Sequence, residues 1–138
     1  MVSIWRLTAM LRLALDSITI NDGLLGKISI SPVPSAHVDN LPSYGYKICS
    51  ETMSLYYSGD SNSINYDILK ELMNGQLDRV YQDTCGDDME AEYHLPLSRL
   101  KEIVDIRIKH KIYCMHLDVY FDTDEAEKLG FNVVSRIV

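Results

Sequence analysis

The chain has 138 residues, of which 46% are hydrophobic and 24% are charged, and its formal net charge is −7. This length and composition are typical of one modest globular domain with a packed core, and they exclude a disordered chain. The acidic balance disfavours a broad electrostatic surface for nucleic acid, although it is compatible with a local basic pocket.

The sequence shows no membrane span and no secretory leader. No apolar run reaches the roughly 18–20 residues that cross a bilayer. Arg6, Arg12 and Asp16 interrupt the apolar N-terminal stretch, which also lacks a small-residue cleavage site. The three cysteines are widely spaced and form no Cys-x-x-Cys pair, as expected of small apolar residues in a reducing compartment. We therefore expect a cytoplasmic protein that does not contact a membrane.

The first part of the chain predicts a helix followed by a strand meander. Apolar residues recur with helical spacing over residues 5–18, and Asn-Asp-Gly at 21–23 ends that pattern. Residues 27–33 alternate and are rich in β-branched side chains, which predicts a strand. Two further short strands are predicted over 44–49 and 52–57.

The second part alternates between strands and helices. We expect six elements in the order helix 66–73, strand 78–82, helix 96–109, strand 111–117, helix 124–129 and strand 131–138. A polar segment separates the strand that ends at residue 82 from the next helix. This alternation predicts an α/β domain in which helices pack on a sheet. The last strand runs to the final residue, as it would in a truncated chain.

Three residues with metal-ligating side chains follow predicted strands, where a rigid sheet presents functional groups. They are His37 in Pro-Ser-Ala-His, Asp60 in Tyr-Ser-Gly-Asp and His116 in Tyr-Cys-Met-His. Two imidazoles and one carboxylate are good ligands for zinc and similar metals. A carboxylate has two oxygens, so one aspartate can contact two ions.

Each of these residues also has an ordinary structural explanation. A single histidine after a strand is commonly a surface residue, and a histidine on a buried strand can be a hydrogen-bonded core residue. Gly-Asp is a common turn, because glycine permits positive φ and aspartate tolerates turn geometry. The metal interpretation therefore depends on the wider pattern rather than on any one residue.

That pattern resembles a known family from residue 27 to the end of the chain. After His37 comes Leu-Pro-Ser-Tyr-Gly-Tyr-Lys-Ile at 41–48, then Tyr-Ser-Gly-Asp-Ser at 57–61. Gln-Asp-Thr, a later histidine, a strand ending in histidine and Glu-Ala-Glu-Lys-Leu-Gly-Phe-Asn-Val at 125–133 follow in order. This order is similar to the second half of metallo-β-lactamase-fold hydrolases, especially the ribonuclease Z-like phosphodiesterases. The resemblance implies one domain over 1–138, with a helix and linker at 1–26 before the matching region.

The resemblance also implies a fold and a site. The fold would be half of an αββα sandwich, a mixed sheet with helices on one face. His37 would bind one metal ion, Asp60 would bridge two ions and His116 would bind the second. The ions would be zinc, with manganese as the alternative, and they would activate a bridging hydroxide. His94 would contact the substrate phosphate or protonate the leaving oxygen, and Asp83 would orient His94.

The chain departs from the family in lacking its early His-x-His-x-Asp-His motif. Zinc sites need at least three protein ligands per ion, so the three late ligands cannot hold two ions tightly. We therefore expect little or no activity from this chain alone. Either a separate polypeptide supplies the other half, or the sequence is truncated and Met1 is an internal start.

Three functional hypotheses follow. The first is a metal-dependent hydrolase of phosphodiesters, such as RNA or a cyclic nucleotide. The second is a non-catalytic half-domain that acts as a subunit or interaction module. The third is a small acidic α/β binding protein whose similarity to the family arose by chance. A lone half would expose one apolar sheet face, so we expect self-association or a missing N-terminal half as partner.

Overall fold

The computed structural model describes residues 16–86 and 91–134. The strands of this part are β1 (Ile18–Asp22), β2 (Gly26–Ser35), β3 (Ser43–Cys49), β4 (Ser54–Tyr57), β5 (Arg79–Cys85), β6 (Leu95–Pro96), β7 (Ile112–Met115) and β8 (Asn132–Val133). The helices are α2 (Tyr66–Met73), α3 (Leu97–Ile103), the short 3-10 helix η2 (Lys109–Lys111) and α4 (Thr123–Lys128). None of the described helices has the length and apolarity needed to cross a membrane.

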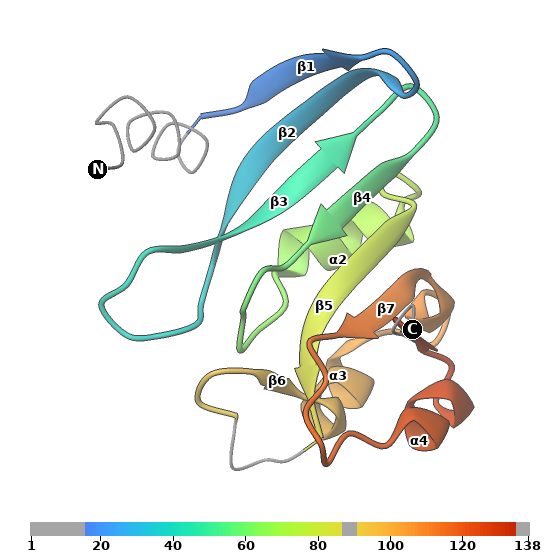
Figure 1. Ribbon diagram of the computed structural model, residues 1–138. Coiled ribbons are helices and arrows are strands. Elements are labelled where there is room, and N and C mark those ends of the chain that lie inside the picture. Colours follow the sequence, from blue (N-terminus) through green and yellow to red (C-terminus); the bar gives the residue numbers. More distant parts are fainter. Residues whose placement is uncertain (1–15, 87–90, 135–138) are drawn as a thin grey trace.

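Eight strands form one mixed sheet in the order β1-β2-β3-β4-β5-β7-β8, with β6 paired to β5 (Figure 1). The first four strands are antiparallel neighbours joined by turns. From β4 onward the pairs are parallel, and a helix lies between consecutive strands along the main path. Parallel pairs need such crossover connections, whereas antiparallel pairs need only turns. The mixed α/β architecture agrees with the prediction from the sequence.

The helices cover one face of the sheet. On this face Tyr56, Val80, Ile112 and Cys114 are at most 1% exposed. They belong to one core with apolar residues of the three α-helices: Ile68, Leu69, Leu72, Leu97, Leu100 and Ala126. An ion pair of 2.7 Å between Lys47 of β3 and Glu71 of α2 adds a polar contact at the edge of this layer.

The opposite face of the sheet is also apolar. Successive strand residues point to opposite faces, so register assigns each residue to a side. We call this side the open face; its residues are Ile18, Ile20, Ile28, Ile30, Tyr46, Ile48, Leu55, Tyr57, Tyr81, Tyr113 and Met115. None of them belongs to the buried core, and all are partly or largely exposed. In Figure 1, α2 lies behind β4 and β5, away from this face.

Three predicted elements differ from the structure. The helix expected over 5–18 lies outside the described residues except for its last three positions, and Ile18 begins strand β1 instead. The helix expected over 96–109 is the shorter α3, because Val104 adopts an extended conformation (φ −94°, ψ 122°). Strand β8 is shorter than the predicted strand 131–138, of which residues 135–138 lie outside the described part.

Strand β5 extends further than predicted. The prediction ended it at residue 82 and placed Asp83 in a polar segment, whereas β5 continues to Cys85. Gln82, Asp83 and Thr84 are polar but fully buried. The carboxylate of Asp83 accepts a hydrogen bond from Ser61 N–H, and the side chains of Gln82 and Thr84 donate to nearby backbone carbonyls, so the strand can continue into the interior.

Candidate metal centre

The predicted site residues gather at one edge of the sheet. Strands β4, β5 and β7 are parallel, so their carboxyl ends meet at this edge with Asp60, Asp83 and His116. Strand β2 runs in the same direction as β4 through two antiparallel pairings, which brings His37 to the same end. Leu95 of β6 pairs with Thr84 of β5, so the preceding residue His94 lies beside Asp83.

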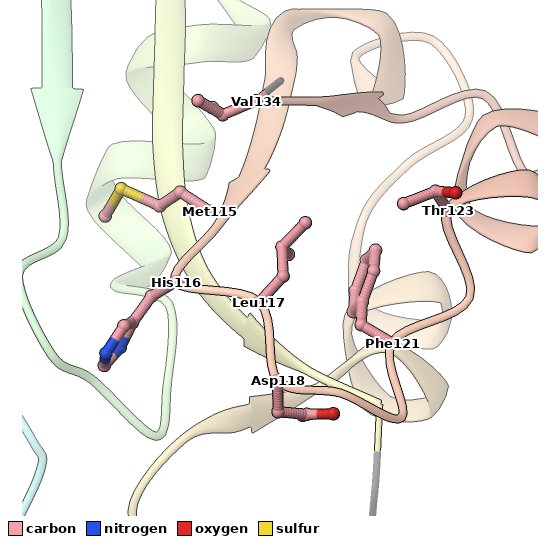
Figure 2. A pocket seen from close by; sticks show the side chains of 7 residues that line it. All are labelled: Met115, His116, Leu117, Asp118, Phe121, Thr123 and Val134. Carbon is pink, nitrogen blue, oxygen red and sulfur yellow. The ribbon is translucent and has the colours of Figure 1, made fainter. Parts of the chain in front are cut away.

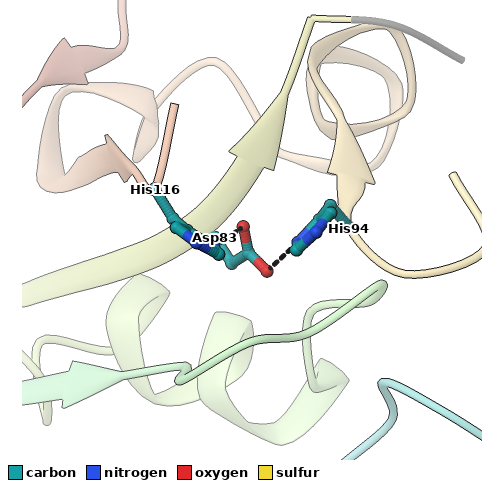
Figure 3. Close-up of side chains that lie close together, drawn as sticks. All are labelled: Asp83, His94 and His116. Atoms are coloured by element: carbon teal, nitrogen blue, oxygen red, sulfur yellow. Dashed lines mark hydrogen bonds and ion pairs between the residues drawn. The ribbon is translucent and has the colours of Figure 1, made fainter. Parts of the chain in front are cut away.

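Asp83 is the buried centre of this group, with no exposed surface. Its Oδ2 accepts hydrogen bonds from the backbone N–H of Ser61 (2.8 Å) and lies 2.7 Å from Nδ1 of His94. Its Oδ1 lies 3.3 Å from Nδ1 of His116. A buried carboxylate is tolerated only when it is paired or hydrogen-bonded. Both oxygens of Asp83 are therefore engaged by the groups that surround it (Figure 3).

His116 sits directly after β7 in a strained backbone conformation. Its φ is +58°, in the left-handed region that side chains other than glycine seldom adopt. Its Nδ1 lies 3.5 Å from Oδ1 of Asp60, in addition to its contact with Asp83. The imidazole packs edge-on against His94, with ring centroids 5.0 Å apart. Such strain persists where the surrounding structure fixes it, and it clusters at functional sites.

His37 is the third imidazole at this edge. Its Nδ1 lies 2.7 Å from the carbonyl oxygen of Tyr93, and its ring centroid is 5.6 Å from that of His94. A carbonyl can only accept, so Nδ1 of His37 must carry the proton. Nδ1 of His94 likewise faces a carboxylate oxygen. Both imidazoles thus keep Nε2 free for a ligand, the arrangement in which histidines commonly bind metals.

The donor set fits a metal ion. Asp83, His94 and His116 offer ligand atoms that all lie within 4.8 Å of one another, the one such group within residues 16–86 and 91–134. Three nitrogen or oxygen ligands with room for another are what catalytic zinc sites provide. Asp83 can serve either as a direct ligand or as the carboxylate that orients both histidines, because its oxygens already contact their Nδ1 atoms.

The structure and the sequence prediction share residues but group them differently. The predicted ligands were His37, Asp60 and His116, whereas the tight group consists of Asp83, His94 and His116. Asp60 contacts His116, but its side chain is 59% exposed. The contact expected between Asp83 and His94 is present at 2.7 Å. The role of each residue in metal binding or catalysis stays a prediction.

The sequence predicts a polar loop at 58–62, but it did not reveal the hydrogen bonds by which this loop supports the site residues. Ser58 Oγ accepts a hydrogen bond from the backbone N–H of Asp83 (2.9 Å), and Ser61 N–H binds its carboxylate. The side-chain amide nitrogen of Asn62 donates to the backbone carbonyl oxygens of His37 and Glu92. The run Ser-Gly-Asp-Ser-Asn directly after a strand was the available signal, but only the aspartate was singled out.

A pocket of about 480 Å³ adjoins His116 (Figure 2). Its lining is mainly apolar and includes Leu117 and Phe121, while the imidazole of His116 points away from it. The Asp118 carboxylate accepts hydrogen bonds from the backbone N–H groups of Gly86 (2.7 Å) and Tyr120 (2.6 Å). A side chain at Gly86 would overlap the backbone of Tyr120, so glycine is required at this crossing.

Comparisons with known proteins address the fold. No protein-family model matches the sequence, and no curated protein matches it significantly. The chain is similar in structure to the metallo-β-lactamase fold protein YhfI from Bacillus subtilis, with a TM-score of 0.54 and 15% identity over 85% of this chain and 48% of that chain. It is also similar to Zn²⁺-bound PqqB from Methylobacterium extorquens, with a TM-score of 0.51 and 13% identity over 85% of this chain and 50% of that chain.

At these identities the likeness shows the fold and not the activity. The chain spans about half the length of both structures. Over the part that it shares with them it has the metallo-β-lactamase fold, which confirms the fold expected from the late sequence motifs.

Proposed function

We propose that this chain forms part of the metal centre of a metal-dependent hydrolase that acts on phosphodiesters. The observation that carries the proposal is the buried Asp83 carboxylate, which contacts His94 and His116 at the carboxyl edge of the sheet. Burial of a carboxylate costs free energy unless the group is paired and hydrogen-bonded, and such buried ionisable groups cluster at functional sites. Zinc is the proposed metal, with manganese as the alternative.

Each residue of the candidate site has a proposed role. Asp83 holds the Nδ1 proton of His94 and so leaves Nε2 of His94 directed to the substrate or the metal. In the first case Nε2 carries a second proton, so that the imidazolium of His94 donates its Nε2 proton to the leaving oxygen and keeps its Nδ1 proton in the hydrogen bond to Asp83, as a general acid does. His116, Asp60 and His37 add donor atoms for one or two ions. A bound zinc ion would supply Lewis acidity and lower the pKa of water at this edge.

The phosphodiester assignment is supported by the sequence motifs. His37 precedes the Pro-Ser-Tyr-Gly-Tyr strand, and the Asp83–His94 pair follows it, as in ribonuclease Z-like phosphodiesterases. The structurally similar PqqB is bound to Zn²⁺, which favours zinc as the metal of this chain. RNA or a cyclic nucleotide is the proposed substrate class.

A specific observation favours a second candidate function. The open face is apolar and lies outside the buried core, and the chain spans about half of the similar structures. Exposed apolar faces of this kind mark association surfaces. The alternative is therefore a non-catalytic half-domain that associates with a partner, either the missing N-terminal half or a second copy.

Hydrolysis of bis(p-nitrophenyl) phosphate by the full chain with zinc or manganese tests the proposal. We expect slow, metal-dependent release of p-nitrophenolate, because the early metal motif is absent from this sequence, and about 10–100-fold slower release by His94→Ala, because that variant loses one of the three side chains of the metal-binding group. His110→Ala is the matched control, since His110 is exposed on η2.

Two outcomes would count against the proposal. Hydrolysis no faster than the metal blank would contradict catalysis by this chain and favour the non-catalytic alternative. Faster opening of a β-lactam such as nitrocefin than hydrolysis of the diester would contradict the assigned substrate class.

A further inference from the structure

The loop after β4 connects the two segments that carry His37 and His94. Its backbone N–H at Asn62 donates to the carbonyl oxygen of Ala36 (2.8 Å). The side-chain amide nitrogen of Asn62 donates to the carbonyl oxygens of Glu92 (2.8 Å) and His37 (3.4 Å). One residue therefore holds two segments that are 25 and 30 residues away from it in sequence.

Only an amide nitrogen suits this position. Both partners of the side chain are carbonyl oxygens, so the nitrogen and not the oxygen of the amide must face them. The NH₂ group has two hydrogens and can serve both carbonyls at once. An aspartate of the same shape would place a negative charge against two carbonyl dipoles, and a serine hydroxyl has one hydrogen to give.

The bonds of Asn62 lie next to those that orient the histidines. Glu92 is held by Asn62, the carbonyl oxygen of Tyr93 receives Nδ1–H of His37 at 2.7 Å, and His94 contacts Asp83. These are three consecutive residues of one segment. The preceding loop residue, Ser61, binds Asp83 through its N–H and Ala36 through its Oγ (3.1 Å). A change at residue 62 is thus passed directly to the His37–Tyr93 contact.

We propose that Asn62 is a positioning residue that clamps the His37 segment to the His94 segment and so fixes the tautomer of His37 and its distance from His94. The inference rests on the proposed function for its relevance to metal binding, but the clamp itself does not require a metal.

The test compares Asn62→Asp and Asn62→Ala with the wild-type chain by two measurements. Long-range ¹H–¹⁵N spectra of the metal-free protein report the protonated nitrogen of each imidazole. We expect His37 to be protonated at Nδ1 in the wild type and to populate both tautomers in the variants. Titration with zinc alone against a coloured chelator should show about 10–100-fold weaker binding in the variants, as is usual for lost outer hydrogen bonds around metal ligands.

Asn74→Asp is the matched control, because Asn74 caps α2 through its backbone N–H, which the substitution keeps. If Asn62→Asp does not fold, Asn62→Ser retains one donor and should give smaller shifts in the same direction. An unchanged His37 tautomer in all folded Asn62 variants would overturn the proposal, even if their stability fell. Absence of zinc binding in the wild type would contradict the proposed function, while the tautomer comparison would still decide the role of Asn62.

Discussion

At the scale of single residues, Asp83 determines the chemistry of the sheet edge. It is fully buried, and its carboxylate receives the Ser61 N–H and contacts two imidazoles. Its neighbours in the strand, Gln82 and Thr84, are turned to the opposite face of β5. The polar side chains of this strand therefore divide between the helix layer and the candidate site.

Replacing Asp83 by asparagine should destabilise the fold. Ser61 N–H and Nδ1 of His94 both contact Oδ2, so an amide must either turn its NH₂ group towards these two donors or keep its oxygen there as a weaker, neutral acceptor. We expect a loss of about 1–3 kcal/mol in the free energy of unfolding, measured by urea denaturation. Asp124→Asn, at an exposed position of α4, is the control. Equal stability of both variants would contradict the role given to the buried carboxylate.

Ionisation of the buried Tyr56 should lower the stability of the fold at alkaline pH. Burial raises the pKa of Tyr56 to about 12, whereas tyrosine in an unfolded chain ionises near pH 10. The folded state therefore keeps the proton that the unfolded state releases, and the contribution to stability is present below pH 10 and is lost as the pH rises to about 12. The stability of Tyr56→Phe should fall less steeply over this window in urea denaturation. Tyr66→Phe, at an exposed position, is the control. If the stability of Tyr56→Phe falls with pH as steeply as that of the wild type and of this control, the prediction is refuted.

The sequence predicted the members of the site better than their contacts. Strand-end placement singled out His37, Asp60 and His116, and the family resemblance added His94 and Asp83. The pairing register of β5 with β6 and β7 sets which of them touch, and register cannot be deduced from spacing along the chain. For the same reason the clamp at Asn62 was missed, because both of its partners are distant in sequence.

At the scale of elements, local patterns predicted the long strands and two of the helices. Strands β2, β3 and β4 and helices α2 and α4 lie within a few residues of their predicted bounds, because alternation and helix-start residues are local signals. Strand β6 has two residues and was not predicted, since its pairing with β5 is its main determinant. The early end of α3 follows from Asp105, whose carboxylate binds the N–H and guanidinium of Arg107 and stabilises a turn instead.

Helix α2 depends on its N-terminal residue. Asn65 precedes the helix in an extended conformation, and its side chain accepts a hydrogen bond from the N–H of Asp67 (2.8 Å). Asn65→Ala should lower the free energy of unfolding by about 1 kcal/mol, the usual effect of removing such a cap. Asn74→Ala at the other end keeps the backbone cap and should have a smaller effect in the same thermal or urea experiment. A smaller loss at Asn65 than at Asn74 would show that the cap does not stabilise α2.

At the scale of the whole molecule, helices cover one face of the sheet and leave the other face exposed. Helices bury one face, whereas the open face presents apolar residues such as Ile20 (44% exposed) and Tyr57 (43% exposed). Apolar surface of this extent favours association, because its burial removes it from water.

We expect the chain to self-associate in the absence of a partner, with a sedimentation coefficient that rises with concentration. The double variant Ile20→Lys and Tyr57→Lys should shift it towards the monomer, since two charges on the open face oppose its burial. Tyr66→Lys, at an exposed position of α2 on the other side of the sheet, is the control and should leave association unchanged. A wild type that stays monomeric at high concentration would contradict this expectation.

We infer that the edge formed by the ends of β4, β5 and β7 is a metal centre. Its most direct test is the zinc bound per chain at equilibrium, measured on the wild type, His116→Ala and Asp83→Asn after dialysis against buffered zinc. We expect at least about one tightly held ion per chain in the wild type and about tenfold or more weaker binding in both variants, because each variant changes one of the three side chains of the candidate group. Equal and near-zero zinc in all three proteins, while circular dichroism shows them folded, would contradict it.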